Sequence, residues 1–194
     1  MEHFYNTLGE NWFSYPSLYS SMVKKFGNNS KFVEIGTWKG MSAVYMAVEI
    51  INSGKKIKFD CVDTWEYIWK DDEITDIDYS KYDNLFNIFL KNIEPVKSII
   101  TPIKEISWEA AKHYNDNTLD FVFIDAGHDY TSVIKDLNAW YPKVKIGGVI
   151  SGHDYTQPTC GVKKAVDEFF NDKKITELEG CWVYEKLESL YSNT

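Results

Sequence analysis

Two short apolar runs of this sequence, each rich in β-branched residues, end in an acid and a histidine. One run is followed by Asp125 and His128, and a later run is followed by His153 and Asp154. Carboxylates and imidazoles can ligate a divalent ion, and an imidazole can also take a proton from a reacting group. Because open α/β sheets bind ligands at the carboxyl ends of their strands, we expect both pairs to meet in one site.

A third apolar run ends in Glu34, and two glycines, Gly36 and Gly40, come before the next helical stretch. Glycine lets the backbone turn tightly and approach a ligand closely at the start of a helix. The turn lacks the further glycine of the dinucleotide-binding fingerprint, so alone it is a weak signal. Asp63 ends the next apolar run, where an acid can accept hydrogen bonds from both hydroxyls of a ribose; the alternative is the N-cap of a helix.

The spacing of apolar residues predicts the elements that must position these side chains. Strands are expected at residues 31–35, 57–62, 97–103 and 119–124, directly after Gly147 and Gly148, and near 175–178 and 182–186. Helices are expected at residues 12–26, 40–51, 81–93, 108–114 with Ser107 as the N-cap, 130–141 and 162–170. Strands that alternate with helices predict a mostly parallel, Rossmann-like α/β sheet with helices on both faces. A chain of 194 residues has the size of one such domain, with residues 1–30 as a helical cap.

Charge composition narrows the class of partner. The net charge is −8 and the sequence contains no arginine, so a nucleic acid is not an expected partner, because binding its backbone needs a concentrated basic face. Without bidentate guanidinium groups, a neutral, hydroxylated small molecule is easier to accommodate than a carboxylate or a phosphate.

Hydropathy and cysteine usage indicate the compartment. No apolar run approaches the roughly 20 residues that cross a bilayer, and the start of the chain lacks the basic and apolar regions of a signal peptide. We therefore expect a cytoplasmic protein without a membrane partner. Cys61, Cys160 and Cys181 have no paired metal-ligand spacing and are expected to be reduced, with Cys61 and Cys181 in the core. The oligomeric state stays open, a homo-oligomer included.

Residues 65–80 interrupt the alternation of strands and helices. Trp65 and Trp69 are succeeded by a run of acids. Aromatic rings can stack on a sugar or an aryl ring and acids can bind hydroxyls, so we expect this segment to be a lid over the substrate. A solvated surface insertion is the alternative.

Four motifs, in order along the chain, resemble those of class I S-adenosylmethionine-dependent methyltransferases. They are Glu34–Gly40, Ile124–Tyr130, Asp136–Leu137 and Gly147–Tyr155, and the resemblance extends from about residue 32 to residue 185. Within this class, the chain resembles the branch of small-molecule and sugar O-methyltransferases and is similar to methyltransferase family 24. The resemblance implies a seven-stranded sheet with an antiparallel last strand. It also implies that S-adenosylmethionine, which becomes S-adenosylhomocysteine, lies over the carboxyl ends of the first strands.

The same resemblance implies which residues contact the cofactor. Glu34, Gly36 and Gly40 would line its methionine and ribose. Asp63 would hold the ribose, and Ile106 and Ser107 would lie against the adenine. The expected contacts are Glu34, Gly36, Thr37, Gly40, Asp63, Ile106, Ser107 and Asp125.

In metal-dependent relatives, acids at the positions of Asp125 and Asp154 hold magnesium. Here His153 is the expected additional ligand, although imidazole suits softer ions better than Mg²⁺. The alternative is that Asp125 and His153 orient the cofactor and the loops without an ion. His128 has the position of the general base in the sugar-methylating relatives, with a hydrogen-bonded structural histidine as the alternative.

Together these residues predict an enzyme that methylates a hydroxyl oxygen of a small molecule, a sugar among the candidates. The sequence after the 119–124 strand lacks the Asn/Asp-Pro-Pro-aromatic turn of many amino-group methyltransferases, which favours oxygen as the acceptor. Two alternatives keep the fold: a non-catalytic cofactor-binding protein or partner subunit, and a hydroxylase-like protein. Retention of the two acid and histidine pairs disfavours a non-catalytic protein.

Overall fold

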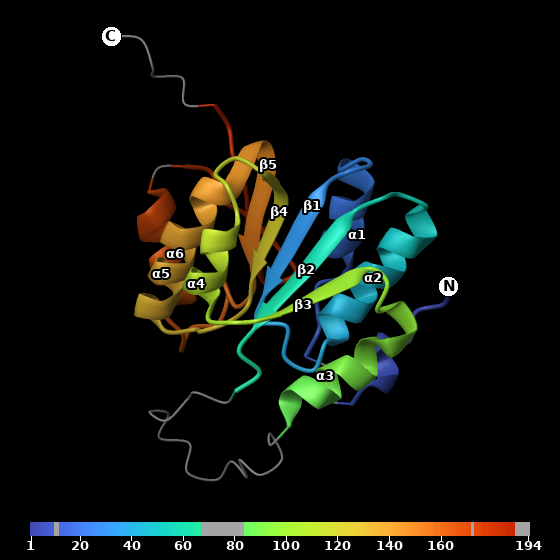
Figure 1. Ribbon diagram of the computed structural model, residues 1–194. Coiled ribbons are helices and arrows are strands. Elements are labelled where there is room, and N and C mark those ends of the chain that lie inside the picture. Colours follow the sequence, from blue (N-terminus) through green and yellow to red (C-terminus); the bar gives the residue numbers. More distant parts are fainter. Residues whose placement is uncertain (10–11, 67–83, 172, 189–194) are drawn as a thin grey trace.

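Seven strands form one sheet in the order β3-β2-β1-β4-β5-β7-β6 (Figure 1). The computed structural model describes residues 1–9, 12–66, 84–171 and 173–188. The strands are β1 (Lys31–Ile35), β2 (Lys58–Asp63), β3 (Ile100–Lys104), β4 (Leu119–Ile124), β5 (Val144–Gly152), β6 (Thr176–Leu178) and β7 (Cys181–Glu185). Strands β1 to β5 are parallel, and β7, the last strand, runs antiparallel to both neighbours. This confirms the expected Rossmann-like α/β fold.

Helices cover both faces of the sheet (Figure 1). One face carries α1 (Pro16–Lys25), α2 (Met41–Ser53) and α3 (Leu85–Ile93), and the other carries α4 (Ser107–Ala110), α5 (Tyr130–Trp140) and α6 (Val162–Phe170). Because both faces of a parallel sheet are buried, its strands are nearly continuous apolar runs, which is why the sequence pattern located them.

The alternation of side chains along β1 divides the core into two clusters. Phe32 packs into the cluster beneath α1, α2 and α3, whereas Val33 and Ile35 pack into the cluster beneath α4, α5 and α6. Glu34 is only 1% exposed, although it is an acid. The strand therefore brings a buried carboxyl group to the beginning of the β1–α2 turn.

The β1–α2 turn lies against the end of β4 through Gly36. This residue has a φ of +84°, and a Cβ added to it would lie 2.0 Å from the carbonyl oxygen of Asp125. The Asp125 N–H in turn donates to the carbonyl oxygen of Ile35 at 2.7 Å. Only glycine combines this backbone conformation with so close an approach.

Two strands begin three or more residues away from the position that the sequence pattern indicated. β5 starts at Val144, so Gly147 and Gly148 lie inside the strand and do not precede it. Gly147 has a φ of +78°, and the register with β4 shifts nearby, so the glycines accommodate an irregularity within the strand. β3 begins at Ile100, because a short 3₁₀ helix at Glu94–Val96 precedes it.

The first helix is also shorter than the apolar pattern predicted. Pro16 occupies its first turn, where a missing N–H costs nothing, so Trp12–Tyr15 precede the helix as an irregular segment. Glu179, in the turn between β6 and β7, accepts hydrogen bonds at Oε2 from the backbone N–H groups of Ser17 and Leu18, at 3.1 and 3.3 Å. The turn near the carboxyl end of the fold thus caps the amino-terminal helix.

The three cysteines have the surroundings expected from the sequence. Cys61 and Cys181 are buried and Cys160 is partly exposed, and all three are free thiols. Residues 67–80 of the expected lid lie outside the described residues, as do residues 81–83 of the helix expected at 81–93, which the structure shows as α3. Within the described residues, none of the helices has the length and apolar character needed to cross a membrane.

The close approach at Gly36 predicts a large loss of stability on substitution. Gly36→Ala places a Cβ on the backbone of Asp125, whereas Gly54→Ala meets open space at a similar φ of +67°. The left-handed conformation alone costs about 1–2 kcal/mol for alanine, so Gly54→Ala measures that part by itself. We expect the free energy of unfolding, measured in urea, to fall by at least about 2 kcal/mol more in Gly36→Ala than in Gly54→Ala. Equal losses of stability in the two variants would show that the β1–α2 turn can move away from Asp125 at no cost in free energy.

Candidate active site

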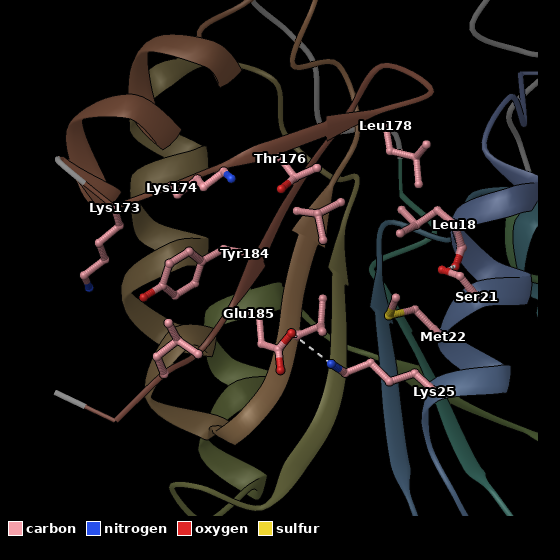
Figure 2. A pocket seen from close by; sticks show the side chains of 13 residues that line it. Leu18, Ser21, Met22, Lys25, Lys173, Lys174, Thr176, Leu178, Tyr184 and Glu185 are labelled. Atoms are coloured by element: carbon pink, nitrogen blue, oxygen red, sulfur yellow. Dashed lines mark hydrogen bonds and ion pairs between the residues drawn. The ribbon is translucent and has the colours of Figure 1, made fainter. Parts of the chain in front are cut away.

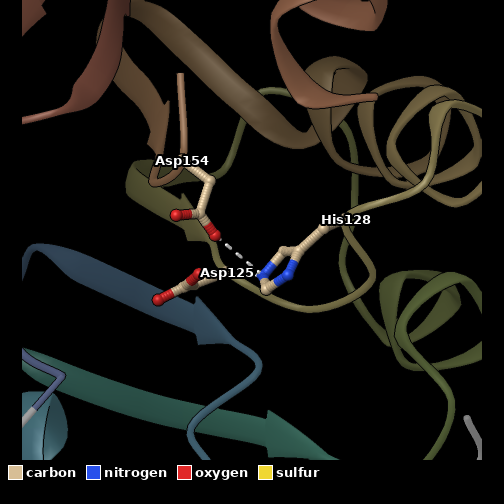
Figure 3. Close-up of side chains that lie close together, drawn as sticks. All are labelled: Asp125, His128 and Asp154. Atoms are coloured by element: carbon tan, nitrogen blue, oxygen red, sulfur yellow. Dashed lines mark ion pairs between the residues drawn. The ribbon is translucent and has the colours of Figure 1, made fainter. Parts of the chain in front are cut away.

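Two acids and a histidine converge where β4 and β5 end (Figure 3). His128 Nε2 lies 3.1 Å from Asp154 Oδ2 and 3.5 Å from Asp125 Oδ1. One ligand atom from each of these residues lies within 4.8 Å of the others, a spacing at which they could hold a metal ion. The side chain of His128 is 45% exposed, whereas the two carboxylates are mostly buried. The sequence-predicted strand ends therefore do form one site, which we call the acid–histidine cluster (Asp125, His128 and Asp154).

His153 borders this cluster and is held on both sides of its ring. Its Nδ1 lies 3.2 Å from Asp154 Oδ1 and 4.0 Å from Asp125 Oδ1, while its Nε2 lies 3.2 Å from Ser14 Oγ. Burial lowers the pKa of His153, but the hydrogen bond to Asp154 and the charges of both acids outweigh it and raise the pKa above its usual value. The hydrogen bond from His153 lowers the pKa of Asp154. The group of side chains whose spacing could hold an ion thus includes His128, and His153, the ligand expected from the sequence, borders this group.

The loops that carry the cluster are tied to each other. The N–H of Gly161, before α6, donates to the carbonyl oxygen of His128 at 2.8 Å, and a Cβ at Gly161 would collide with the backbone of Tyr130. Asp154 has a φ of +59°, a conformation that few residues other than glycine adopt. The Cys160 thiol donates to the carbonyl oxygen of Asp154 at 3.4 Å. Strained backbone of this kind clusters at functional sites.

Asp63 connects the β1–α2 turn with the segment that follows β2. Its Oδ2 accepts a hydrogen bond from the N–H of Trp38 at 2.8 Å, and its Oδ1 accepts one from the N–H of Trp65 at 2.7 Å. Burial raises the pKa of Asp63, while the backbone hydrogen bonds oppose that rise. These bonds fix the carboxylate beside the β1–α2 turn.

Two polar side chains at the β1–α2 turn have unused hydrogen-bonding capacity. Thr37 Oγ1 and Glu34 Oε2 are buried and make no hydrogen bond of ordinary geometry within the described part of the chain, although the Tyr19 hydroxyl lies close enough to the Glu34 carboxyl group to lower its pKa. The Ser42 hydroxyl donates to the other carboxyl oxygen of Glu34. Burial raises the pKa of Glu34 to about 8, so the group is mostly protonated at neutral pH. The turn therefore offers buried polar atoms that a bound molecule can satisfy.

The residues expected at the adenine differ in their surroundings. Ile106 is 39% exposed at the end of β3. Ser107 is the first residue of α4 and not its N-cap, a position that Ile106 takes. The Ser107 hydroxyl accepts a hydrogen bond from Trp140 Nε1 at 2.9 Å. It also faces Asp136, whose pKa burial raises to about 6 against the opposing effect of this hydroxyl.

Two residues that sequence reasoning missed reach the site from the segment before α1. The Tyr15 hydroxyl donates to Asp125 Oδ2 at 3.1 Å, and the Ser14 hydroxyl contacts His153. Burial and the charge of Asp125 raise the pKa of Tyr15 well above its usual value, so the hydroxyl remains a donor. The apolar pattern assigned both residues to a helix. Pro16 was the one available signal that the helix begins after Tyr15.

Trp65 has a different environment from the one expected of a lid residue. It is 4% exposed and packs on the rings of Phe86 and Phe89, with centroids 4.7 and 4.6 Å apart. Its Nε1 donates to the carbonyl oxygen of Trp38 at 2.9 Å. Trp65 therefore belongs to the core, because its ring finds apolar neighbours on α3. Trp69 lies outside the described residues.

A separate hollow of about 490 Å³ lies between α1 and the strands β5, β6 and β7 (Figure 2). Its walls are apolar, among them Leu18, Met22 and Val183, and the ion pair of Lys25 with Glu185 crosses it at 2.9 Å. None of its lining residues belongs to the acid–histidine cluster. We therefore assign the chemistry to the cluster and not to this hollow.

Comparison with protein families defines the class. A family model described as a methyltransferase domain matches residues 33–155, which is more than half of the chain and includes the β1–α2 turn and the acid–histidine cluster. The protein thus belongs to this family, methyltransferase family 24, and has the sheet of class I S-adenosylmethionine-dependent methyltransferases. A comparison with curated proteins found no match.

Solved structures share the fold at low sequence identity. The O-methyltransferase NovP is similar with a TM-score of 0.66 and 16% identity, over 89% of this chain and 79% of NovP. An rRNA methylase from Streptococcus thermophilus has a TM-score of 0.61 and 10% identity, over 89% of this chain and 95% of the methylase. SMU.1697c from Streptococcus mutans, in complex with S-adenosylhomocysteine, has a TM-score of 0.58 and 10% identity, over 86% of this chain and 93% of its own. At these identities the likeness shows the fold alone, and it does not decide between a small molecule and RNA as acceptor.

The raised pKa of Glu34 predicts how stability depends on pH. An acid whose pKa is raised by folding stabilises the folded state below the pKa of the unfolded chain, and this contribution is lost as pH rises toward the folded pKa of about 8. Glutamine does not titrate, so Glu34→Gln does not lose stability in this way as pH rises. The free energy of unfolding of the variant minus that of the wild type should therefore increase from about pH 5 to pH 8. Urea unfolding at several pH values measures the difference. If the difference between variant and wild type does not change with pH, Glu34 is ionised over this whole pH range. Glu109→Gln, which alters an exposed acid, is the control.

Proposed function

We propose that this protein transfers a methyl group from S-adenosylmethionine to a hydroxyl oxygen of a small molecule. The observation that carries the proposal is the convergence of Asp125, His128 and Asp154 at the carboxyl edge of a methyltransferase sheet. Gly36 places the β1–α2 turn directly against the backbone of Asp125. A methyl donor held at this turn would thus lie beside the groups that can bind and deprotonate an acceptor.

Residues of the β1–α2 turn fit the cofactor. The buried Thr37 Oγ1 lacks a hydrogen-bond partner among the described residues. Each carboxylate oxygen of Asp63 accepts one backbone N–H and retains capacity for a ribose hydroxyl. Gly36 and Gly40 have φ of +84° and +85°, and the backbone of Asp125 and the ring of Phe89 fill the space that their Cβ atoms would take, so both glycines are needed for the shape of the turn.

These observations support an assignment of residues to the parts of the cofactor. The methionine and ribose portions would contact Glu34, Gly36, Thr37 and Gly40, with Asp125 beside the methyl group. The ribose hydroxyls would bind Asp63, and the adenine would lie against Ile106, whose side chain is exposed at the end of β3, and Ser107.

When bound, S-adenosylmethionine would supply the methyl group: the acceptor oxygen would form the new C–O bond while the C–S bond breaks, and the electron pair would leave with the sulfur as S-adenosylhomocysteine. An acceptor hydroxyl placed among Asp125 Oδ1, Asp154 Oδ2 and His128 Nε2 gives its proton to Nε2. The two carboxylates, at 3.5 and 3.1 Å, favour the imidazolium that results. His128 is therefore the general base, and Asp125 orients the acceptor.

A divalent ion at the same place is the alternative use of the cluster. Two carboxylates and an imidazole fit a transition-metal ion such as Mn²⁺ better than Mg²⁺, which prefers oxygen ligands. Because His128 Nε2 cannot both ligate an ion and take a proton, the two arrangements exclude each other. His153 faces Asp154 and Ser14 with its two nitrogens and would support the cluster from outside.

Charge favours a neutral, hydroxylated acceptor such as a sugar. The chain has a net charge of −8 and no arginine, which disfavours RNA even though an rRNA methylase shares the fold. The groups of the cluster can hydrogen-bond hydroxyls without needing a charged partner.

Cofactor binding is tested by isothermal titration with S-adenosylhomocysteine. Asp63→Ala should weaken binding by about 1–3 kcal/mol, because the ribose hydroxyls lose their acceptor. Asp60→Ala, on the same strand and bonded to Tyr114 at 2.8 Å, should bind like the wild type. An absence of heat with the wild type at high ligand concentration would refute the cofactor assignment.

The base is tested by turnover in a screen of sugars, nucleotide sugars and catechols. His128→Ala should lower kcat by about 10²–10⁴, the usual contribution of a general base, with unchanged affinity for S-adenosylhomocysteine. His113→Ala, which alters an exposed histidine paired with Glu105, is the matched control. Full turnover in His128→Ala would show that the assignment is wrong.

The same assay decides between the two uses of the cluster. Activity that persists after chelation but is lost in Asp125→Asn supports direct orientation of the acceptor by the carboxylate. If activity disappears on chelation and returns with Mn²⁺, then Asp125, His128 and Asp154 hold an ion and His128 is not the general base.

A further inference from the structure

The segment before α1 contributes a side chain to the acid–histidine cluster. Tyr15 is 2% exposed, and its hydroxyl donates to Asp125 Oδ2 at 3.1 Å, on the oxygen opposite the one that faces His128. One carboxylate oxygen is thus occupied by the tyrosine, and the other is turned toward the place assigned to the acceptor.

The position of the Tyr15 ring is fixed from several sides. Its centroid lies 4.7 Å from that of Phe123 on β4, 4.7 Å from that of Phe13 and 4.9 Å from that of His153. Helix α1, which begins directly after Tyr15, is held by Glu179, which accepts two backbone N–H groups of its first turn. A ring held in this way can impose an orientation on the carboxylate that it contacts.

From this geometry we propose that Tyr15 is a positioning residue for methyl transfer: its hydroxyl holds Asp125 Oδ2 and thereby presents Oδ1 to the acceptor and to His128. The inference rests on the proposed function for its effect on turnover, but the orientation of Asp125 is a property of the protein alone. Tyr15 does not touch the reacting atoms and acts only through Asp125.

The chain offers a matched control. Tyr114 donates to Asp60 Oδ2 at 2.8 Å, which is the same type of partly buried bond, and neither residue belongs to the acid–histidine cluster. Tyr15→Phe and Tyr114→Phe each remove one hydroxyl and keep the ring. Effects on stability that come from losing such a bond are therefore common to both variants.

The first measurement needs no acceptor. Imidazole ¹⁵N–¹H correlation spectra at one fixed pH report the surroundings of the four histidines, with His3 and His113 as internal references. We expect the signals of His128 and His153 to move in Tyr15→Phe and to stay in place in Tyr114→Phe. Unchanged His128 and His153 signals in Tyr15→Phe, or equal changes in both variants, would overturn the proposal.

The second measurement separates positioning from packing. Tyr15→Phe should lower kcat by about 10- to 100-fold, as other residues that orient a functional side chain do, while the KM for S-adenosylmethionine stays unchanged. In an Asp125→Asn background the same substitution should have little further effect on any residual turnover, because it acts through Asp125. A full additional loss in that background would contradict the proposal. If the wild type methylates no acceptor, the proposed function fails, and the histidine spectra still decide whether Tyr15 orients Asp125.

Discussion

The backbone contact between Gly36 and Asp125 constrains everything at this edge of the sheet. β1 and β4 are neighbouring parallel strands, and the turn that leaves β1 crosses so close to the end of β4 that no side chain fits between them. The same contact places the turn assigned to the methyl donor beside the acid assigned to the acceptor. In the proposed arrangement, sheet geometry and this glycine would set the distance between the methyl donor and the acceptor more than flexible side chains would.

The parts of the fold that depend on local sequence could be predicted from it. The strands β1 and β4 and the helix α6 were predicted with their observed bounds, because continuous apolar runs and helical spacing are strong local signals. β5 was misplaced at its start, because glycines that usually mark a turn here lie within an irregular strand. Trp65 was assigned to a lid, because an aromatic residue in a polar context does not reveal whether a distant helix covers it.

The site was predicted in part for the same reason. Asp125, His128 and Asp154 come directly after apolar strands, and parallel neighbouring strands bring the residues at their carboxyl ends to one edge, so their meeting could be anticipated. The contact of Tyr15 with Asp125 joins residues that are 110 positions apart, and no local pattern encodes it. The sequence likewise does not reveal that His128 lies near both acids while His153 borders the cluster, because these positions depend on the conformations of the loops.

The cap that Glu179 places on α1 has a consequence for the order in which the protein can form. During synthesis, Glu179 and the strand β7, which lies between β5 and β6, leave the ribosome long after α1, because Glu179 follows Ser17 by 162 positions. Contacts between such distant parts of a chain form slowly, because a long loop must close before they contribute. The cap of α1 thus forms only after the strands β1 to β6 have been synthesised. Nascent chains that lack the β6–β7 hairpin would leave the backbone N–H groups of Ser17 and Leu18, close to Tyr15, without their acceptor.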